Sequence, residues 1–296
     1  MITSIKKLKK YKIPIAYSLD NNYVYPTLVS LTSLIETKNY KTFYDIYLMI
    51  SNNFTLKNKK KLKSIEQKYR RKCSIKFINM TNLFTNLKKG PISQYYRLAL
   101  HEKLPDMDKI IYLDGDTLIF EDLKAMYDLN MKGKYILGFI DNIYYALESF
   151  GIRNAIVINS GVLLMDLNAL RKYNTTDKFN DFIKLLNNSI DQGDQTLINV
   201  VLQKHISTLP PRYGMWGFEN EYFAKEHNKI QKPWLRYRYK EFIEAFNHPV
   251  ILHYTGAKPF RDKKAVYYSL WWEYAKKTGF FNEINNYSNF SNYSTY

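Results

Sequence analysis

The chain has 296 residues, of which 46% are hydrophobic, so it can hold one large domain or two modest ones, and wholesale disorder is excluded. Its formal net charge of +17 attracts phosphate groups of nucleotides, nucleic acids or lipids, although over-use of lysine alone would give the same balance. The single cysteine, Cys73, excludes an internal disulfide framework and a multi-cysteine zinc site.

Hydropathy gives no sign of a membrane span. No window approaches ~20 consecutive apolar residues, and the apolar stretch after the basic N-terminus is too short for a secretory signal. We therefore expect a cytoplasmic protein that is soluble, or that is attached peripherally to the inner face of a membrane.

Strands and helices are expected to alternate along the first half of the chain. Runs rich in β-branched and aromatic residues predict strands, and apolar residues three and four apart predict helices. The expected strands cover 13–19, 43–50, 73–80 and 109–113, and the expected helices cover 21–39, 55–72 and 93–104. This alternation favours an α/β domain with a mostly parallel central sheet flanked by helices.

The second half is more mixed. Further strands are expected at 134–140, 161–167 and near 250, and further helices at 194–204 and 263–277. We expect a catalytic domain over 1–259, a basic and aromatic helical extension over 260–281, and a disordered polar tail over 282–296. The extension suits an anionic membrane surface, or Trp271 and Trp272 pack on the catalytic domain instead.

Two carboxylates follow the expected strand 109–113 directly. Asp114 and Asp116, with Gly115 between them, would repel each other if buried bare, so a cation is expected beside them. Ligands bind at the carboxyl ends of strands in α/β sheets, and hard oxygen ligands suit Mn²⁺ or Mg²⁺. A capped turn or a helix N-terminus is the alternative. A second pair, Asp106 and Asp108, follows a proline and predicts a solvated turn.

The sequence "HYTGAKPF" ends the last expected strand. His253 is either a hydrogen-bonded core residue or a metal ligand beside the two carboxylates. Gly256 permits a tight loop, and Lys258 supplies a cation for a phosphate. Templates for a P-loop, a dinucleotide-binding fold, a zinc protease and a serine hydrolase are not met.

Ordered motifs between Ile13 and Lys277 resemble glycosyltransferase family 8, the retaining transferases that include bacterial lipopolysaccharide galactosyl- and glucosyltransferases and glycogenin. The motifs are "IPIAYSLDNNY", "QYYRLAL", "IIYLDGDTLI", "GFID", "VINSGVLLMDL", "DQGDQTLIN" and "HYTGAKPF". The last is one residue shorter than usual before Lys258, and Phe260 replaces the usual tryptophan.

This resemblance implies a GT-A, Rossmann-like fold, a UDP-sugar donor, and a Mn²⁺ or Mg²⁺ ion held by Asp114, Asp116 and His253. Front-side attack is expected because Gln195, at the position where a nucleophile would stand, is a poor nucleophile. The implied catalytic residues are Asp194, Gln195 and Lys258. The implied donor-binding residues are Asp20, Asn22, Arg97, Asp114, Gly115, Asp141, Asn159, Gly256 and Lys258.

The expected function is transfer of glucose or galactose from a UDP-sugar to a glycan or a lipid-linked saccharide. A glycogenin-like protein that glucosylates its own tyrosine is an alternative. The other is a non-catalytic nucleotide- or nucleic-acid-binding protein, favoured by the basic charge and by "KPWLRYRYKEF" (232–242). That alternative leaves the carboxylate pair unexplained, so no nucleic acid is expected as a partner.

Overall fold

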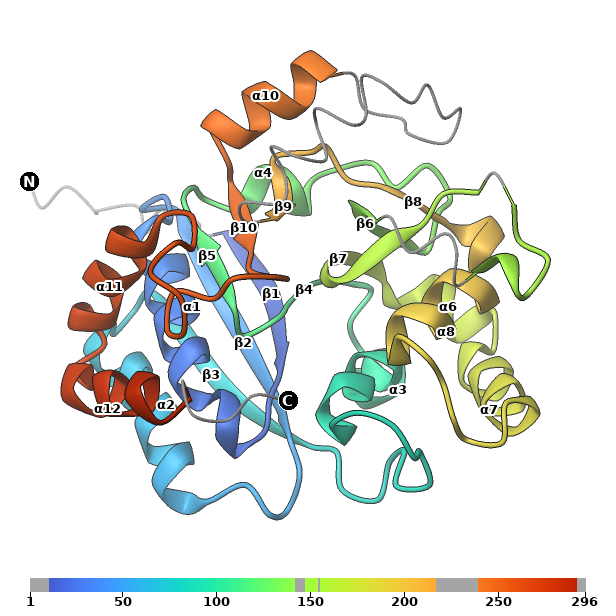
Figure 1. The fold of residues 1–296 in the computed structure, drawn as a ribbon, viewed down its shortest axis with the longest axis horizontal. Coiled ribbons are helices and arrows are strands. Elements are labelled where there is room, and N and C mark those ends of the chain that lie inside the picture. The colour runs from blue at the N-terminus through green and yellow to red at the C-terminus, as the bar shows by residue number, and fades with distance from the viewer. Residues whose placement is uncertain (1–10, 142–146, 154, 217–238, 292–296) are drawn as a thin grey trace, which may run out of the picture.

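The computed structural model describes residues 11–141, 147–153, 155–216 and 239–291 (Figure 1). The basic N-terminus, most of 232–242 and the last five residues therefore lie outside the described residues. Within them, seven strands form one sheet in the order β3-β2-β1-β4-β7-β6-β8, and three short strands form a second sheet in the order β5-β10-β9.

The bounds of the strands are β1 (Tyr11–Ser18), β2 (Thr42–Ile50), β3 (Cys73–Asn79), β4 (Lys109–Leu113), β5 (Thr117–Ile119), β6 (Ile136–Ile140), β7 (Ile158–Asp166), β8 (Ile206–Thr208), β9 (Tyr213–Trp216) and β10 (Ile251–His253). The α-helices are α1 (Val24–Glu36), α2 (Leu56–Lys68), α3 (Leu100–Lys103), α4 (Lys124–Tyr127), α6 (Leu167–Lys172), α7 (Thr175–Leu185), α8 (Gly193–Val201), α10 (Tyr239–Asn247), α11 (Tyr268–Lys277) and α12 (Phe281–Ser291). The 3₁₀ helices are η1 (Asn21–Tyr23), η2 (Ile92–Ala99) and η3 (Gln203–His205).

The large sheet is mostly parallel, as the alternation predicts. β1 pairs in parallel with β2 and β4, β2 with β3, and β6 with β8, whereas β7 runs antiparallel to both β4 and β6. Figure 1 shows α1, α2, α11 and α12 on one side of this sheet and α3, α6, α7 and α8 on the other. Central strands covered on both faces become continuously apolar, and β1 is buried from Ile13 to Ser18.

Helix α1 is buried around nearly its whole circumference. Its residues from Pro26 to Ile35 are all buried, because it packs against β5 of the small sheet on one side and against α2 and α11 on others. A helix enclosed in this way loses the polar face of a surface helix. It therefore joins the two sheets into one body.

The helix expected over 93–104 differs in form. The segment winds as the 3₁₀ helix η2 and only then as the single α-turn of α3. Five successive residues, 95–99, are buried, so packing on every side sets the winding rather than one apolar stripe.

The C-terminal helices α11 and α12 pack against the rest of the chain. Trp271 is 1% exposed and belongs to a core cluster shared with the small sheet, so the aromatic side of α11 faces the protein. Helix α12 occupies most of the expected disordered tail, because Phe280, Ile284 and Tyr287 form an apolar stripe at helical spacing. Segments 1–259 and 260–291 thus share one hydrophobic core.

None of the helices in the described residues is long and apolar enough to cross a membrane.

Candidate active site

A cavity of ≈ 690 Å³ opens at the carboxyl ends of β1 and β4, where the large sheet meets the small one. This volume is in the range of a nucleotide-sized ligand site. Most residues singled out from the sequence line it. They are Asp20, Asn22, Arg97, Asp114, Gly115, Asp116, Asn159, Asp194, Gln195, His253 and Lys258.

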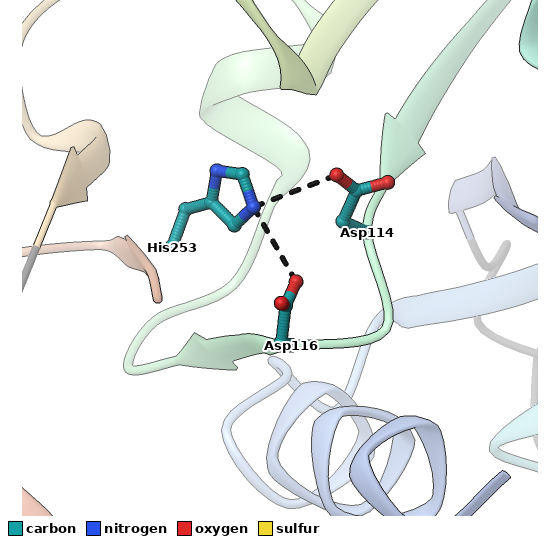
Figure 2. Close-up of side chains that lie close together, drawn as sticks. All are labelled: Asp114, Asp116 and His253. Atoms are coloured by element: carbon teal, nitrogen blue, oxygen red, sulfur yellow. Dashed lines mark ion pairs between the residues drawn. The ribbon is translucent and has the colours of Figure 1, made fainter. Parts of the chain in front are cut away.

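Asp114, Asp116 and His253 converge in this cavity, as Figure 2 shows. His253 Nε2 lies 3.5 Å from Asp114 Oδ2 and 3.3 Å from Asp116 Oδ1. One candidate ligand atom from each residue lies within 4.8 Å of the others. The ring of His253 is buried and faces both carboxylates, an arrangement that fits a hydrogen-bonded core residue as well as a metal ligand.

Two strand pairings bring His253 to the carboxylates. Asp114 directly follows β4, and β10 pairs antiparallel with β5 so that His253 stands opposite Thr117. The backbone N–H of Tyr254 donates to Asp116 O at 3.1 Å and fixes the position of the end of β10 relative to Asp116. The histidine thus arrives from a distant part of the chain through the small sheet.

Two glycines make room for this arrangement. A Cβ at Gly161 would lie 2.1 Å from His253 Cε1 and 2.7 Å from Asp114 Oδ2. A Cβ at Gly115 would lie 2.3 Å from Thr27 Oγ1 of α1. Gly161 therefore keeps the space between the candidate ligands open, whereas Gly115 lets the carboxylate loop lie against α1.

Cationic side chains balance the carboxylates. Arg97 Nη2 lies 2.9 Å from Asp114 Oδ1, and Lys258 Nζ pairs with Asp116 Oδ2. Burial opposes ionisation of both acids, but Arg97 and then His253 keep the pKa of Asp114 below its usual value. Lys258 and His253 likewise hold the pKa of Asp116 well below its usual range despite its burial.

The two carboxylates also shift the pKa of His253. Burial disfavours the charged ring, but hydrogen bonds to Asp114 and Asp116 outweigh it and raise the pKa of His253 to about 9. In the absence of a metal ion, the imidazole is therefore protonated at neutral pH and donates from Nε2. Its Nδ1 is buried and has no hydrogen-bond partner among the described residues.

Arg97 also contacts Asp194, at the first turn of α8. Arg97 Nε lies 3.1 Å from Asp194 Oδ2, but its hydrogen points to Gln94 O at 3.0 Å, so the contact is an ion pair without an aligned hydrogen bond. Burial raises the pKa of Asp194 to about 6, and Arg97 opposes this rise only in part. Asp194 is thus mostly ionised at pH 7.5 and remains close to protonation.

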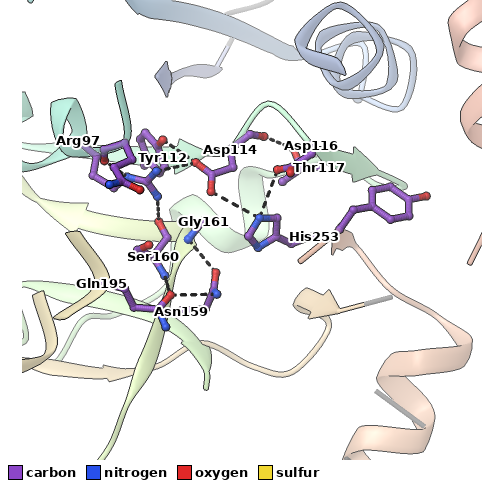
Figure 3. A network of polar contacts seen from close by, with 12 residues as sticks. Arg97, Tyr112, Asp114, Asp116, Thr117, Asn159, Ser160, Gly161, Gln195 and His253 are labelled. Carbon is purple, nitrogen blue, oxygen red and sulfur yellow. Dashed lines mark hydrogen bonds and ion pairs between the residues drawn. The ribbon is translucent and has the colours of Figure 1, made fainter. Parts of the chain in front are cut away.

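A network of amides lies on the side of α8 and β7 (Figure 3). Asn159 Nδ2 donates to Asp141 Oδ2 at 3.0 Å and to Gln195 Oε1 at 3.2 Å, and Gln195 Nε2 donates to the same Asp141 oxygen at 3.0 Å. Asp141 therefore lies behind Asn159 and Gln195 rather than on the cavity wall. Asn199 secures α8 to β7, because its Oδ1 accepts from Ile158 N and its Nδ2 donates to Ile158 O.

The remaining predicted residues have separate positions. Asp20 lines the cavity and also caps η1, accepting from Asn22 N at 2.8 Å and Tyr23 N at 3.2 Å. Gly256 does not line the cavity. Asp106 and Asp108 are both exposed in the surface turn just before β4, which confirms the expectation of a solvated turn.

Sequence reasoning missed several lining residues, namely Ser18, Leu19, Tyr23, Pro91, Ser93, Gln94, Ser160, Gln192, Thr255 and Arg261. Tyr23 donates to Asp116 Oδ2 at 3.1 Å, and Tyr112 donates to Asp114 Oδ1 at 2.7 Å. Tyr23 had a usable signal, since it directly follows Asn22 in the segment after β1. Arg261 had no such signal, because nothing in the sequence distinguishes this exposed loop residue from the other arginines.

The donor atoms of Asp114, Asp116 and His253 fit one divalent cation. Two carboxylate oxygens and one imidazole nitrogen are a mixed set accepted by Mn²⁺ and its neighbours in the transition series. His253 would have to lose its ring proton to bind such an ion, whose charge would then offset that of the two acids.

The fold is that of the GT-A glycosyltransferases. The galactosyltransferase LgtC, solved in complex with donor and acceptor sugar analogues, matches with a TM-score of 0.74 and 20% identity over 90% of this chain and 96% of LgtC. The chain belongs to glycosyl transferase family 8, whose model matches residues 14–264.

Curated relatives agree with the family. The glycosyltransferase GlyF of Streptococcus pneumoniae is 24% identical over 272 residues, which cover 88% of this chain and 60% of GlyF. The lipopolysaccharide 1,2-glucosyltransferase of Escherichia coli is 24% identical over 268 residues, covering 86% of this chain and 75% of that enzyme. The chain thus spans about three fifths of the length of GlyF.

Proposed function

We propose that the protein is a retaining hexosyltransferase that moves glucose or galactose from a UDP-sugar to a glycan or lipid-linked saccharide, with Mn²⁺ or Mg²⁺ as cofactor. The observation that carries this proposal is the cluster of Asp114, Asp116 and His253 at the sheet edge of a family 8 chain, inside a cavity large enough for the donor. The relatives named for galactosyl and glucosyl transfer support the choice of sugars.

The cavity divides into subsites by chemistry. Asp20 and Asn22, at the end of β1, would hold the nucleoside, and Asp114, Asp116 and His253 would hold the ion, with Gly115 between the acids. When bound, the ion would supply Lewis-acid stabilisation of the diphosphate. On the other side of the cavity, the sugar would meet Asn159, Asp194 and Gln195, with Asp141 fixing two of these amides.

Lys258 would stabilise the leaving group. As the sugar–phosphate bond breaks, the departing UDP gains negative charge, and a cation fixed beside it lowers the energy of that state. The ammonium of Lys258 is already held by Asp116 and by Tyr254 O, so it is placed before the donor arrives. Gly256, two residues earlier, would then serve the turn rather than touch the donor.

Gln195 favours front-side attack over a double displacement. An amide is a poor nucleophile, and both ends of the Gln195 amide are engaged by Asn159, Asp141 and the N–H of Ser160. The acceptor oxygen would then bond to the anomeric carbon on the face that the diphosphate leaves, and the proton of the acceptor hydroxyl would pass to the departing phosphate oxygen. Asp194, mostly ionised, would stabilise positive charge on the sugar ring.

UDP release from a panel of UDP-sugars, with Mn²⁺ or EDTA, tests the proposal. We expect metal-dependent release from one donor, and Asp116→Asn should reduce it by roughly 10²-fold or more. Asp106→Asn is the matched control, because it changes the exposed Asp-x-Asp pair. Equal release from wild type and Asp116→Asn would contradict the assignment, as would failure of the wild type to bind UDP with Mn²⁺ present.

The alternatives make different predictions. A self-glucosylating protein would gain mass in hexose steps when it is incubated with a UDP-sugar and no acceptor. A non-catalytic binding protein would bind nucleotide or nucleic acid in a salt-sensitive way that ignores Mn²⁺.

We place the enzyme on the cytoplasmic side, with peripheral attachment to an anionic membrane. The net charge of +17 and the exposed lysines Lys276 and Lys277 at the end of α11 support this, whereas the buried Trp271 does not contribute. Sedimentation with anionic and neutral vesicles tests it. Binding that does not depend on anionic lipid, or that is unchanged in a Lys276→Ala, Lys277→Ala variant, would contradict it.

A further inference from the structure

The turn after β10 carries two cations to the cavity. Lys258 and Arg261 both line it, although only Lys258 belongs to the motif that resembles the family. The backbone N–H groups of Arg261 and Asp262 both donate to Lys258 O at 2.8 Å, so a tight turn fixes the two cations relative to each other. Lys258 is paired with Asp116, whereas Arg261 is an exposed residue at the rim of the cavity.

Helices α11 and α12 hold this turn from outside. Trp272 Nε1 donates to Pro259 O at 3.2 Å, and Ser288 Oγ donates to Phe260 O at 2.6 Å. Between these bonds the Phe260 side chain is fully buried, and its ring centroid lies 5.6 Å from that of Tyr287. The turn therefore cannot shift without breaking contacts to both helices.

Tyr287 connects α12 to the turn that carries Arg261. Cζ of Arg261 lies over the Phe260 ring, 5.6 Å from its centroid, and Tyr287 packs against the same ring. Burial raises the pKa of Tyr287, Arg261 opposes the rise, and Asp20 and Asp116 add to it. Arg261 lines the cavity, whereas Tyr287 does not, so Tyr287 would act on the cavity through Arg261.

The position of α12 is itself fixed. Lys61 of α2 is 6% exposed and pairs with Glu283, and Tyr25 of α1 donates to the same carboxylate at 2.9 Å. The Tyr25 and Tyr287 rings also pack together, with centroids 5.3 Å apart. The turn that carries Arg261 is thus bonded to a helix that is itself anchored to α1 and α2.

We propose that Arg261 is a second cation for the diphosphate of the nucleotide-sugar donor and that α12 positions it through Tyr287. This inference rests on the proposed function. A guanidinium binds phosphate oxygens through two parallel N–H groups, and Lys258 alone meets the diphosphate as a point charge. Fixing the side chain in advance reduces the entropy that its ordering would cost on binding.

Affinities for UDP and for uridine test the role of Arg261, because uridine lacks the diphosphate. In one Mn²⁺-containing buffer, Arg261→Ala should bind UDP about tenfold more weakly than wild type and uridine equally well. Arg261→Lys should recover part of the loss. Lys264→Ala is the control, since it removes an exposed positive charge three residues away that does not line the cavity.

The outcomes separate the two proposals. If wild type binds UDP but Arg261→Ala binds it equally well, or loses UDP and uridine affinity together, the role of Arg261 is wrong and the proposed function stands. If wild type binds neither UDP nor uridine, both proposals fall. Lys264→Ala weakening UDP binding as much as Arg261→Ala would reduce the effect to general charge and overturn the inference.

A double-mutant cycle tests the positioning by α12. Tyr287→Phe removes the hydroxyl and keeps the ring packing, so UDP binding should weaken roughly threefold with uridine binding unchanged. In the Arg261→Ala background the same substitution should have no further effect. An equal loss in both backgrounds would show that Tyr287 acts on the donor without Arg261 and would overturn the positioning step.

Discussion

The two sheets contribute differently to one cavity. The large sheet supplies Asp114 from the end of β4, a strand buried on both faces that pairs antiparallel with β7 along its whole length. The small sheet supplies His253 at the end of β10, and the turn after β10 supplies Lys258. The strands of this sheet have only three or four residues. Three strands this short bury little by themselves, so the cationic side of the cavity depends on the helices that cover it.

This difference locates the weak points of the site. On the large-sheet side, the buried Arg97 lies between the buried Asp194 and the partly buried Asp114, so electrostatic balance is critical. On the small-sheet side, the aromatic packing of α11 and α12 is critical, because it holds the turn that carries Lys258. Perturbing the two sides should therefore have separable effects.

The largest effect is expected at Arg97. Arg97→Met would leave the buried Asp194 and the partly buried Asp114 without their shared cation, which should lower the free energy of unfolding by roughly 3–5 kcal/mol in urea titrations. The control Arg212→Met breaks an exposed pair with Glu121 and should cost about 0–1 kcal/mol. Equal losses from the two variants would mean that buried charge does not govern the large-sheet side.

The next effect concerns the small-sheet side. Trp271→Ala removes a side chain that is 1% exposed and should cost about 3–4 kcal/mol of stability. Tyr40→Ala, at a 69% exposed position, should cost less than about 0.5 kcal/mol. Thermal and urea unfolding measure both. A Trp271→Ala variant as stable as wild type would show that α11 is not part of the core.

Gly161 stands where the two sides meet. Gly161→Ala places a Cβ against His253 and Asp114 and should cost about 1–3 kcal/mol, while weakening Mn²⁺ binding roughly tenfold or more. Gly133→Ala is the control. Its Cβ meets nothing within 4 Å, so only its φ of +74° makes it costly, and Mn²⁺ binding should not change. Calorimetric titration measures the Mn²⁺ affinity of both variants. An equal loss of affinity in both would contradict this role of Gly161.

The smallest expected effect is the release of a proton when a metal ion binds. His253 has a pKa of about 9 without a metal ion, so the ring is protonated below that pH and must lose its proton to bind one. Mn²⁺ binding at pH 7.5 should release about one proton, and affinity should rise with pH up to about 9. Titrations in buffers of different ionisation enthalpy count the proton. Zero release, or the same release from His253→Ala, would contradict the assignment of this ligand.

Local sequence patterns were sufficient where neighbours in the chain are also neighbours in space. The strand over 109–113 and the two carboxylates after it follow from residues within ten positions of one another, and the alternation of strands and helices gave the mostly parallel sheet. Helix α12 was within reach too, since Phe280, Ile284 and Tyr287 have helical spacing. The surrounding asparagines and serines gave the segment the composition of a disordered tail.

By itself, the sequence determined the type of the site: two acids at the end of a buried strand, which require a positive partner. Only the tertiary structure decided what the partners are. Lys258 meets Asp116 across 142 positions, Arg97 joins Asp114 to Asp194, and Trp272 and Ser288 hold the turn that carries Arg261. Coulombic and packing energies depend on distance in space, and chain separation carries no information about that distance until the sheets and helices have closed on one another.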